Sequence, residues 1–255
     1  MGHDGSGRGI RFYLVVILAL DTTTRAGSVA VLNDDAVMSQ VLGNGSVTHG
    51  ERLPPEIERA VDSAGLTIRD VELLAVASGP GAFTGLRIGL AAFQGLAMVL
   101  KVPVIGVSSL DALAFATWPQ IYDPRPATLW AWMDAQRGEV FASRYRARGE
   151  GTDDWSPGEP PVVDEPSRLL ASIGSRQSEG IAFVGDGAVK YRPAIDDWSR
   201  GTWQVIDPPV VLAPAIGAIG RRLAARGLAG PPHALQPLYV RRPDAELERE
   251  RRTSP

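Results

Sequence analysis

Cysteine is absent from this 255-residue sequence, and histidine occurs only at His3, His49 and His233. The missing thiols exclude disulfides, cysteine nucleophiles, iron–sulfur clusters and thiolate-bound zinc. A long apolar run is also missing: the longest, Phe12–Leu20, is far shorter than the roughly 20 residues that cross a bilayer. Since 26 Lys and Arg oppose 29 Asp and Glu, no global positive field indicates nucleic-acid binding. These absences leave an ordinary globular protein with a narrow range of chemistry.

The N-terminal segment superficially resembles a signal peptide, because Arg8 and Arg11 precede the apolar run. The run passes directly into Asp21 and an amphipathic segment, however, without a small-x-small cleavage site. We therefore predict a soluble cytoplasmic protein without a membrane segment. Residues 1–9 are predicted to be a disordered leader, and residues 241–255 a solvated charged tail.

Hydrophobic patterning in the first half predicts the element order βββαβαβα. Strands are expected at 14–20, 27–32, 36–42, 73–78 and 102–107, and helices at 52–64, 86–100 and 109–116, with a short extra helix near 67–70. Gly65 is predicted to end the first helix as its C′ residue. Pro54 and Pro55 fit only a first turn, so that helix should begin close to them or be kinked.

The second half repeats a pattern of the first. Segments 18–31 and 130–142 each contain an apolar strand ending in Asp, a turn with Arg and Gly, and a second strand. The two aspartates, Asp21 and Asp134, are 134 − 21 = 113 residues apart. We therefore predict two related α/β lobes, the first from 10–117 plus about 212–230, the second from 118–211.

Two segments have residues typical of a phosphate site. Asp21, Thr22 and Thr23 follow a buried strand, where a carboxylate and hydroxyls can organise Mg²⁺ and phosphate or simply satisfy turn hydrogen bonds. Gly79 and Gly81 begin a glycine-rich loop before a helix, which fits either an anion cradle or a tight turn. The loop is neither a Walker A motif nor a Rossmann fingerprint.

The helix expected at 86–100 is apolar on nearly all sides, with Gln94 as its one strongly polar residue after Ile88. Such a helix should be buried on both sides, either by the other lobe or by a partner protein. Gly89, Ala92 and Gly95 form a row of small residues that lets another helix approach. His49 lies ahead of the first long helix and is better explained as a capping or packing residue than as a ligand.

Four segments together resemble the TsaB family, formerly called YeaZ: Ile17–Thr24, Ser78–Gly89, Pro103–Leu110 and Met133–Val140. The resemblance is strong from about Ile17 to Leu113 and thinner beyond, through 185–187 and 237–241. It implies two ribonuclease-H-like lobes of the actin, sugar-kinase and Hsp70-like fold. It also implies a role in making threonylcarbamoyladenosine (t6A) at position 37 of tRNA.

The resemblance further implies a non-catalytic subunit that binds a TsaD-like transferase as a heterodimer, assisted by a TsaE-like ATPase, with tRNA reached indirectly. TsaD-like proteins hold a metal through His-x-x-x-His, and this sequence has Ser109 and Leu113 in those places. A hydroxyl and an aliphatic group do not replace two imidazoles, so no metal site is expected. Because the phosphate loops are degenerate, no cofactor is expected either. Binding of ATP or ADP stays an open alternative.

The interface that the resemblance implies uses the helices at 52–64 and 86–100. The candidate contacts are Leu53, Ile57, Val61, Gly89, Ala92, Gly95 and Val99. A homodimer through the same helices is a further hypothesis when the paralogue is absent. The rival interpretations are an ATP-dependent small-molecule kinase, which would use Asp21 and the 79–85 loop, and a metallopeptidase, which lacks metal ligands.

Overall fold

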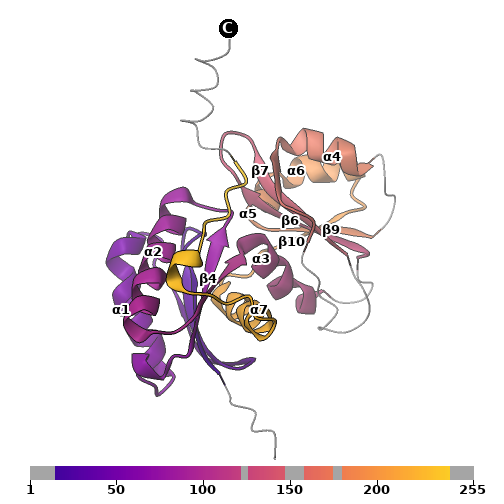
Figure 1. The fold of residues 1–255 in the computed structure, drawn as a ribbon. Helices are drawn as coiled ribbons and strands as arrows, with labels where there is room; N and C mark the ends of the chain where they lie inside the picture. The colour runs from indigo at the N-terminus through magenta and orange to yellow at the C-terminus, as the bar shows by residue number, and fades with distance from the viewer. Residues whose placement is uncertain (1–14, 122–125, 147–157, 175–179, 242–255) are drawn as a thin grey trace, which may run out of the picture.

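The computed structural model describes residues 15–121, 126–146, 158–174 and 180–241 (Figure 1). The leader predicted at residues 1–9 lies outside these ranges, as does the predicted charged tail after Arg241. The chain forms two lobes, each built around a mixed five-stranded sheet.

The predicted order βββαβαβα is confirmed in the first lobe. Its elements are β1 (Val16–Asp21), β2 (Ser28–Asn33), β3 (Ala36–Leu42), α1 (His49–Ser63), β4 (Leu73–Gly79), α2 (Phe83–Leu100), β5 (Val104–Ser108) and α3 (Ser109–Thr117). The short helix expected near 67–70 is a 3₁₀ turn, Ile68–Asp70.

The second lobe contains strands and helices that the sequence analysis located only in part. Its elements are β6 (Thr128–Asp134), β7 (Val140–Arg146), β8 (Val162–Asp164), α4 (Pro166–Gly174), β9 (Ile181–Val184), α5 (Asp186–Lys190), α6 (Arg192–Ser199) and β10 (Gln204–Ile206). The next helix, α7 (Ala213–Ala225), packs on β1, β2 and β4 and so returns the chain to the first sheet.

The two sheets have the same topology. The first runs β3-β2-β1-β4-β5, and the second runs β8-β7-β6-β9-β10 when read in the same sense. In each sheet the first three strands form an antiparallel meander, and the last two pair in parallel. Asp21 and Asp134 end the corresponding strands β1 and β6, which confirms the repeat predicted from the sequence. The architecture is that of two ribonuclease-H-like lobes of the actin, sugar-kinase and Hsp70-like fold.

The central strands are apolar on both faces because helices cover both faces. Alternate residues of β1 enter two cores: Leu18 and Leu20 pack beneath α1 and α2, and Ile17 and Ala19 pack beneath α7. The second core continues through α3 to the inner face of the second sheet, and a third lies on that sheet's outer face around Trp132. The lobes therefore share one continuous apolar core.

A C-terminal strap, residues 231–241, runs from the first lobe to the second (Figure 1). The Gln94 side chain donates from Nε2 to two of its carbonyls, at 3.2 and 3.1 Å. Farther along, the Leu238 N–H donates to the Ser78 carbonyl at 2.7 Å. Arg241 then donates to the carbonyl of Ala135 at the β6–β7 turn. The strap thus braces one flank of α2 and ties the two lobes together.

Candidate functional site

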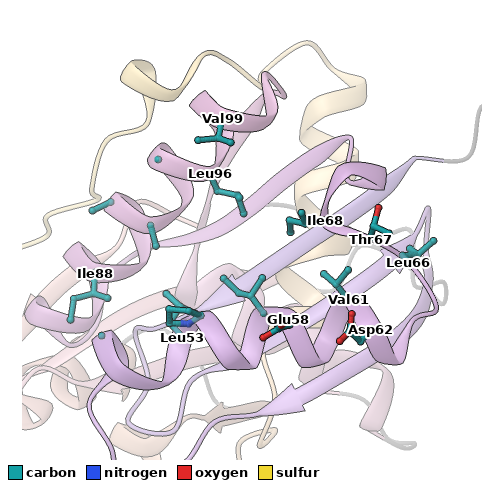
Figure 2. A pocket seen from close by; sticks show the side chains of 16 residues that line it. Leu53, Glu58, Val61, Asp62, Leu66, Thr67, Ile68, Ile88, Leu96 and Val99 are labelled. Atoms are coloured by element: carbon teal, nitrogen blue, oxygen red, sulfur yellow. The ribbon is translucent and has the colours of Figure 1, made fainter.

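Helices α1 and α2 lie side by side on one face of the first sheet and leave a groove between them (Figure 2). On α1, Leu53, Ile57 and Val61 follow at four-residue spacing and line one wall. As predicted, Gly65 ends the helix with a φ of 71°, and the following N–H, of Leu66, donates to the Val61 carbonyl. This reversal carries Leu66 across the end of the groove.

Helix α1 begins earlier than the sequence analysis predicted. His49 is its first residue, so Pro54 and Pro55 lie inside the helix rather than in its first turn. Proline has no backbone N–H, so Pro54 and Pro55 cannot donate the helical hydrogen bonds to the carbonyls of Gly50 and Glu51. Gly50 and Glu51 are both exposed, where a carbonyl without an intrahelical partner costs little, so the helix tolerates the prolines.

The opposite wall of the groove is α2, and the enclosed volume is about 760 Å³. The lining is almost entirely aliphatic or small. It consists of Gly50, Leu53, Pro54, Ile57, Glu58, Val61, Asp62, Leu66, Thr67, Ile68, Ile88, Ala91, Ala92, Gly95, Leu96 and Val99. A long apolar trough of this kind fits the apolar face of a helix.

Six of the seven predicted contacts line the groove, and Gly89 does not. Gly89 is buried, and a Cβ there would lie 2.2 Å from the Oγ1 atom of Thr22. Its role is therefore close packing of α2 against the β1–β2 turn, which corrects its assignment to the interface. Gly95 faces open space, with no atom within 4 Å of its Cβ position.

Of the two ways in which α2 was expected to be buried on both sides, cover by the other lobe is wrong for the described residues, and cover by a partner protein stays a prediction. Phe93 and Ala97 are buried against the sheet, whereas Met98 is 70% and Val99 79% exposed. No described residue of the second lobe lines the groove, so that lobe does not cover this side of α2. An exposed apolar surface of this extent is typical of a protein interface. By length and composition alone α2 also passes for a membrane span, as core helices of soluble proteins do.

The groove has one polar feature that the sequence analysis missed, an acidic rim formed by Glu58 and Asp62. Each follows a groove residue of α1 by one position, so both side chains lie along its outer edge (Figure 2). Their spacing of four along an amphipathic helix was the available signal.

A buried ion pair anchors the first half of α1. Arg52 Nη1 lies 2.8 Å from Glu56 Oε2, and both side chains are nearly inaccessible. Nη2 of the same guanidinium donates to His49 Nδ1 at 2.5 Å. Burial, followed by the Arg52 charge, lowers the pKa of His49. His49 therefore packs and accepts a hydrogen bond in its neutral form.

The residues predicted for a phosphate site are brought together, but they contact one another. Asp21 is buried and accepts from the Thr23 N–H at 2.8 Å and from the Thr23 hydroxyl at 2.6 Å. The Ala82 N–H, at the start of α2, donates to the Thr23 carbonyl. A Cβ on Gly81 would lie 2.5 Å from Thr23 Cβ, and one on Gly79 would lie 2.9 Å from a strap carbonyl. This geometry is that of a packed turn in which Asp21 and Thr23 engage each other, whereas the buried hydroxyl of Thr22 has no hydrogen-bond partner among the described residues.

Comparison with known proteins identifies the family. The family model described as TsaD, tRNA N6-adenosine threonylcarbamoyltransferase, matches residues 44–198. TsaB from Escherichia coli is 37% identical over 135 residues, which are 53% of this chain and 57% of that protein. The structure of YeaZ from Pseudomonas aeruginosa superposes with a TM-score of 0.73 at 26% identity, over 89% of this chain and all of that one. The chain belongs to the TsaB (YeaZ) family.

The extent of the match differs among TsaB relatives. Those named as TsaB in E. coli, Buchnera, Haemophilus and Bacillus are matched over 53–60% of their own length. An uncharacterized protein of Mycobacterium tuberculosis is 30% identical over 239 residues, 92% of this chain and 96% of that one. Another P. aeruginosa structure with the same TM-score is described as similar to a peptidase, YeaZ.

In this TsaB-family chain, Ser109 and Leu113, which the sequence resemblance places at the TsaD metal ligands, lie on α3. Both side chains are buried, and Leu113 belongs to the shared core between the lobes. Within the described ranges no three His, Asp or Glu side chains are grouped as a metal site.

The second lobe places a polar cluster at the turn that corresponds to the Asp21 turn. Asp186 accepts from the Asp134 N–H at 3.0 Å and from the Gly187 N–H at 2.9 Å. Burial raises the pKa of the Asp186 carboxyl. Lys190 Nζ lies 2.8 Å from Asp134 Oδ2 and neutralises that carboxylate. The carboxylates Asp134 and Asp186, like Asp21 in the first lobe, are therefore bound by neighbouring groups of the chain.

Proposed function

We propose that this chain is a non-catalytic subunit of the t6A-modifying machinery, which binds and supports a TsaD-type transferase through the groove between α1 and α2. The observation that carries the proposal is the open apolar groove of about 760 Å³ on a TsaB-family fold. A helix pair of the partner, docked there, would complete a bundle with α1 and α2.

The names of the relatives support the pathway. Four TsaB relatives, at 30–37% identity, are called tRNA threonylcarbamoyladenosine biosynthesis proteins. The exposed residues Met98 and Val99 support the mode of action, because burying them against a partner is favourable by about 25 cal/mol per Å² of apolar surface. Binding of this kind needs no reactive group on this chain.

The site geometry supports a division of labour between the two proteins. The Asp21 turn and the glycine-rich loop are packed against each other. The sequence resemblance places Ser109 and Leu113 of α3 where TsaD-like proteins have their imidazoles. The transferase would therefore carry out the chemistry on the tRNA adenosine, with a TsaE-like ATPase supporting turnover. This subunit would meet tRNA indirectly and act in the cytoplasm.

A reconstituted threonylcarbamoylation assay tests the proposal. Purified transferase, ATPase, threonylcarbamoyl-adenylate and tRNA are incubated with and without this chain, and modified adenosine is measured by mass spectrometry. We expect product only when the chain is present, and none from the chain alone. Equal product without the chain contradicts the proposal, and substrate-dependent phosphoryl transfer would then favour a small-molecule kinase. Metal analysis of the purified chain separately tests the peptidase alternative.

A further inference from the structure

We propose that the C-terminal strap is a releasable latch: Arg241 holds the second lobe in one orientation, and breaking its contacts lets the two lobes pivot about α3. The inference does not depend on the partner proposed above, because it concerns contacts between the lobes of one chain. It starts from the two ends of α3, the helix of the first lobe that packs on β6, β7 and β9 of the second.

The C-terminal end of α3 has the features of a hinge. The chain passes between the lobes after α3 and again before α7. Trp118 of the first connection and Pro209 of the second line the same cavity, whose volume is about 440 Å³. The two connections therefore lie side by side with open space next to them. Rotation of one lobe against the other needs changes in only a few such connecting residues.

The strap ties the lobes together at the N-terminal end of α3. Strand β5 runs directly into α3, and its last residue, Ser108, pairs with Gly79 at the end of β4. The strap binds the residue before Gly79, since the Leu238 N–H donates to the Ser78 carbonyl at 2.7 Å. From there the strap continues toward β7 (Figure 1). Because α3 has nine residues, its two ends are about 13 Å apart, and a tie at that distance from the hinge resists rotation.

The two ends of the strap are held by different kinds of contact. Toward the first lobe, Leu235 is buried in the core beneath α1 and α2, and Gln94 binds two strap carbonyls. Toward the second lobe, Arg241 donates to the Ala135 carbonyl at 2.9 Å and pairs with Glu139, and both charged side chains are partly exposed. Burial of a leucine is costly to reverse, whereas a partly exposed ion pair contributes little and weakens with salt. The strap is therefore built to stay on the first lobe and to release from the second.

The absence of cysteine allows the lobes to be labelled specifically. Met98→Cys on α2 and Asp197→Cys on α6 place spin labels at two exposed positions, one in each lobe. Double electron–electron resonance then measures the distance between them, with excess unlabelled chain added so that distances between copies do not contribute. We expect one narrow distance distribution. Arg241→Met, which keeps an apolar stem and removes the charge and the donors, should shift and broaden it.

Three further measurements show whether the effect belongs to this ion pair. Exchanging the charges, in Glu139→Arg/Arg241→Glu, should restore most of the narrow distribution. Salt at about 0.5 M should broaden the distribution of the chain with Arg241 and leave that of Arg241→Met unchanged, because only the former has a pair to screen. The matched control is Arg226→Met, which removes an exposed arginine at the end of α7 and should leave the distribution as it was.

A narrow, unshifted distribution in folded Arg241→Met would overturn the inference, because the contacts of α3 would then fix the lobes without the strap. Equal broadening in Arg226→Met would overturn it as well. If Arg241→Met does not fold, the salt series on the chain with Arg241 decides. Broadening with salt then supports the latch, and a constant distribution contradicts it.

Discussion

Replacing Gly95 by arginine places a long cationic side chain in the middle of the groove while leaving the fold intact. No atom lies within 4 Å of the Gly95 Cβ position, so the new side chain extends into open space in the groove. Arginine also favours a helix interior over glycine by about 0.7 kcal/mol. We therefore expect Gly95→Arg to unfold at the same or slightly higher urea concentration than the unaltered chain.

The effect on partner binding should be large for the same geometric reason. A docked helix would have to overpack against the new side chain, at about 1–3 kcal/mol, and bury its charge without a designed partner, at several kcal/mol more. A total of at least about 4 kcal/mol corresponds to about a thousandfold increase in Kd. Calorimetric titration with the TsaD-type transferase measures this change directly.

The control for Gly95→Arg is Ala194→Arg, which puts the same side chain on an exposed position of α6, in the second lobe. This variant should bind the partner as the unaltered chain does. If Gly95→Arg is folded by circular dichroism and still binds the partner within about threefold of the unaltered chain, the groove is not the interface.

Three further predictions concern side chains that hold the fold together. Gln94→Ala removes two hydrogen bonds to strap carbonyls and should lower the free energy of unfolding by about 1–3 kcal/mol, measured by urea denaturation. Tyr145→Phe removes the 2.7 Å hydrogen bond that the tyrosine hydroxyl donates to Asp111, a carboxyl whose pKa is raised by burial. This change should lower the free energy of unfolding by about 1.5–3 kcal/mol. Because the pKa of His49 is lowered in the fold, stability should decline as pH falls through its unfolded value of about 6.5. His49→Gln should remove that part of the pH dependence. If the melting temperature of the unaltered chain is the same at about pH 7.5 and about pH 5.5, the prediction is wrong.

The first lobe could be predicted from the sequence because each of its elements has a strong local signal. Strand β1 is an unbroken aliphatic run, and Gly65 has the positive φ that ends a helix sharply. The second lobe has weaker signals. Strands β8 and β10 have three residues each and exist only through pairing with β7 and β9. No short window of sequence encodes such long-range pairing, so these strands were missed.

The candidate contacts show the limit of spacing arguments within one helix. Gly89, Ala92 and Gly95 recur every third residue, which suggests one continuous row of small residues. A helix turns by about 100° per residue, so each step of three falls about 60° short of a full turn. Over two such steps the row drifts by about 120°, which is why Gly89 faces Thr22 and Gly95 faces the groove. Sequence spacing identified the helix, and only the structure shows which side faces outward.

The packing around α2 also explains why the glycine-rich segment has two competing interpretations. The first turns of the helix are pressed against the β1–β2 turn, since a Cβ on Gly85 would lie 2.1 Å from the Thr22 carbonyl. The strap holds another flank through Gln94 and through Tyr239, whose hydroxyl accepts from Arg87 Nε at 3.2 Å. With one side on the sheet as well, much of the free surface of α2 faces the groove, although Met98 is exposed outside the lining. The glycines that look like a phosphate cradle instead fix a helix rigidly, and a rigid binding face loses little conformational entropy when a partner docks.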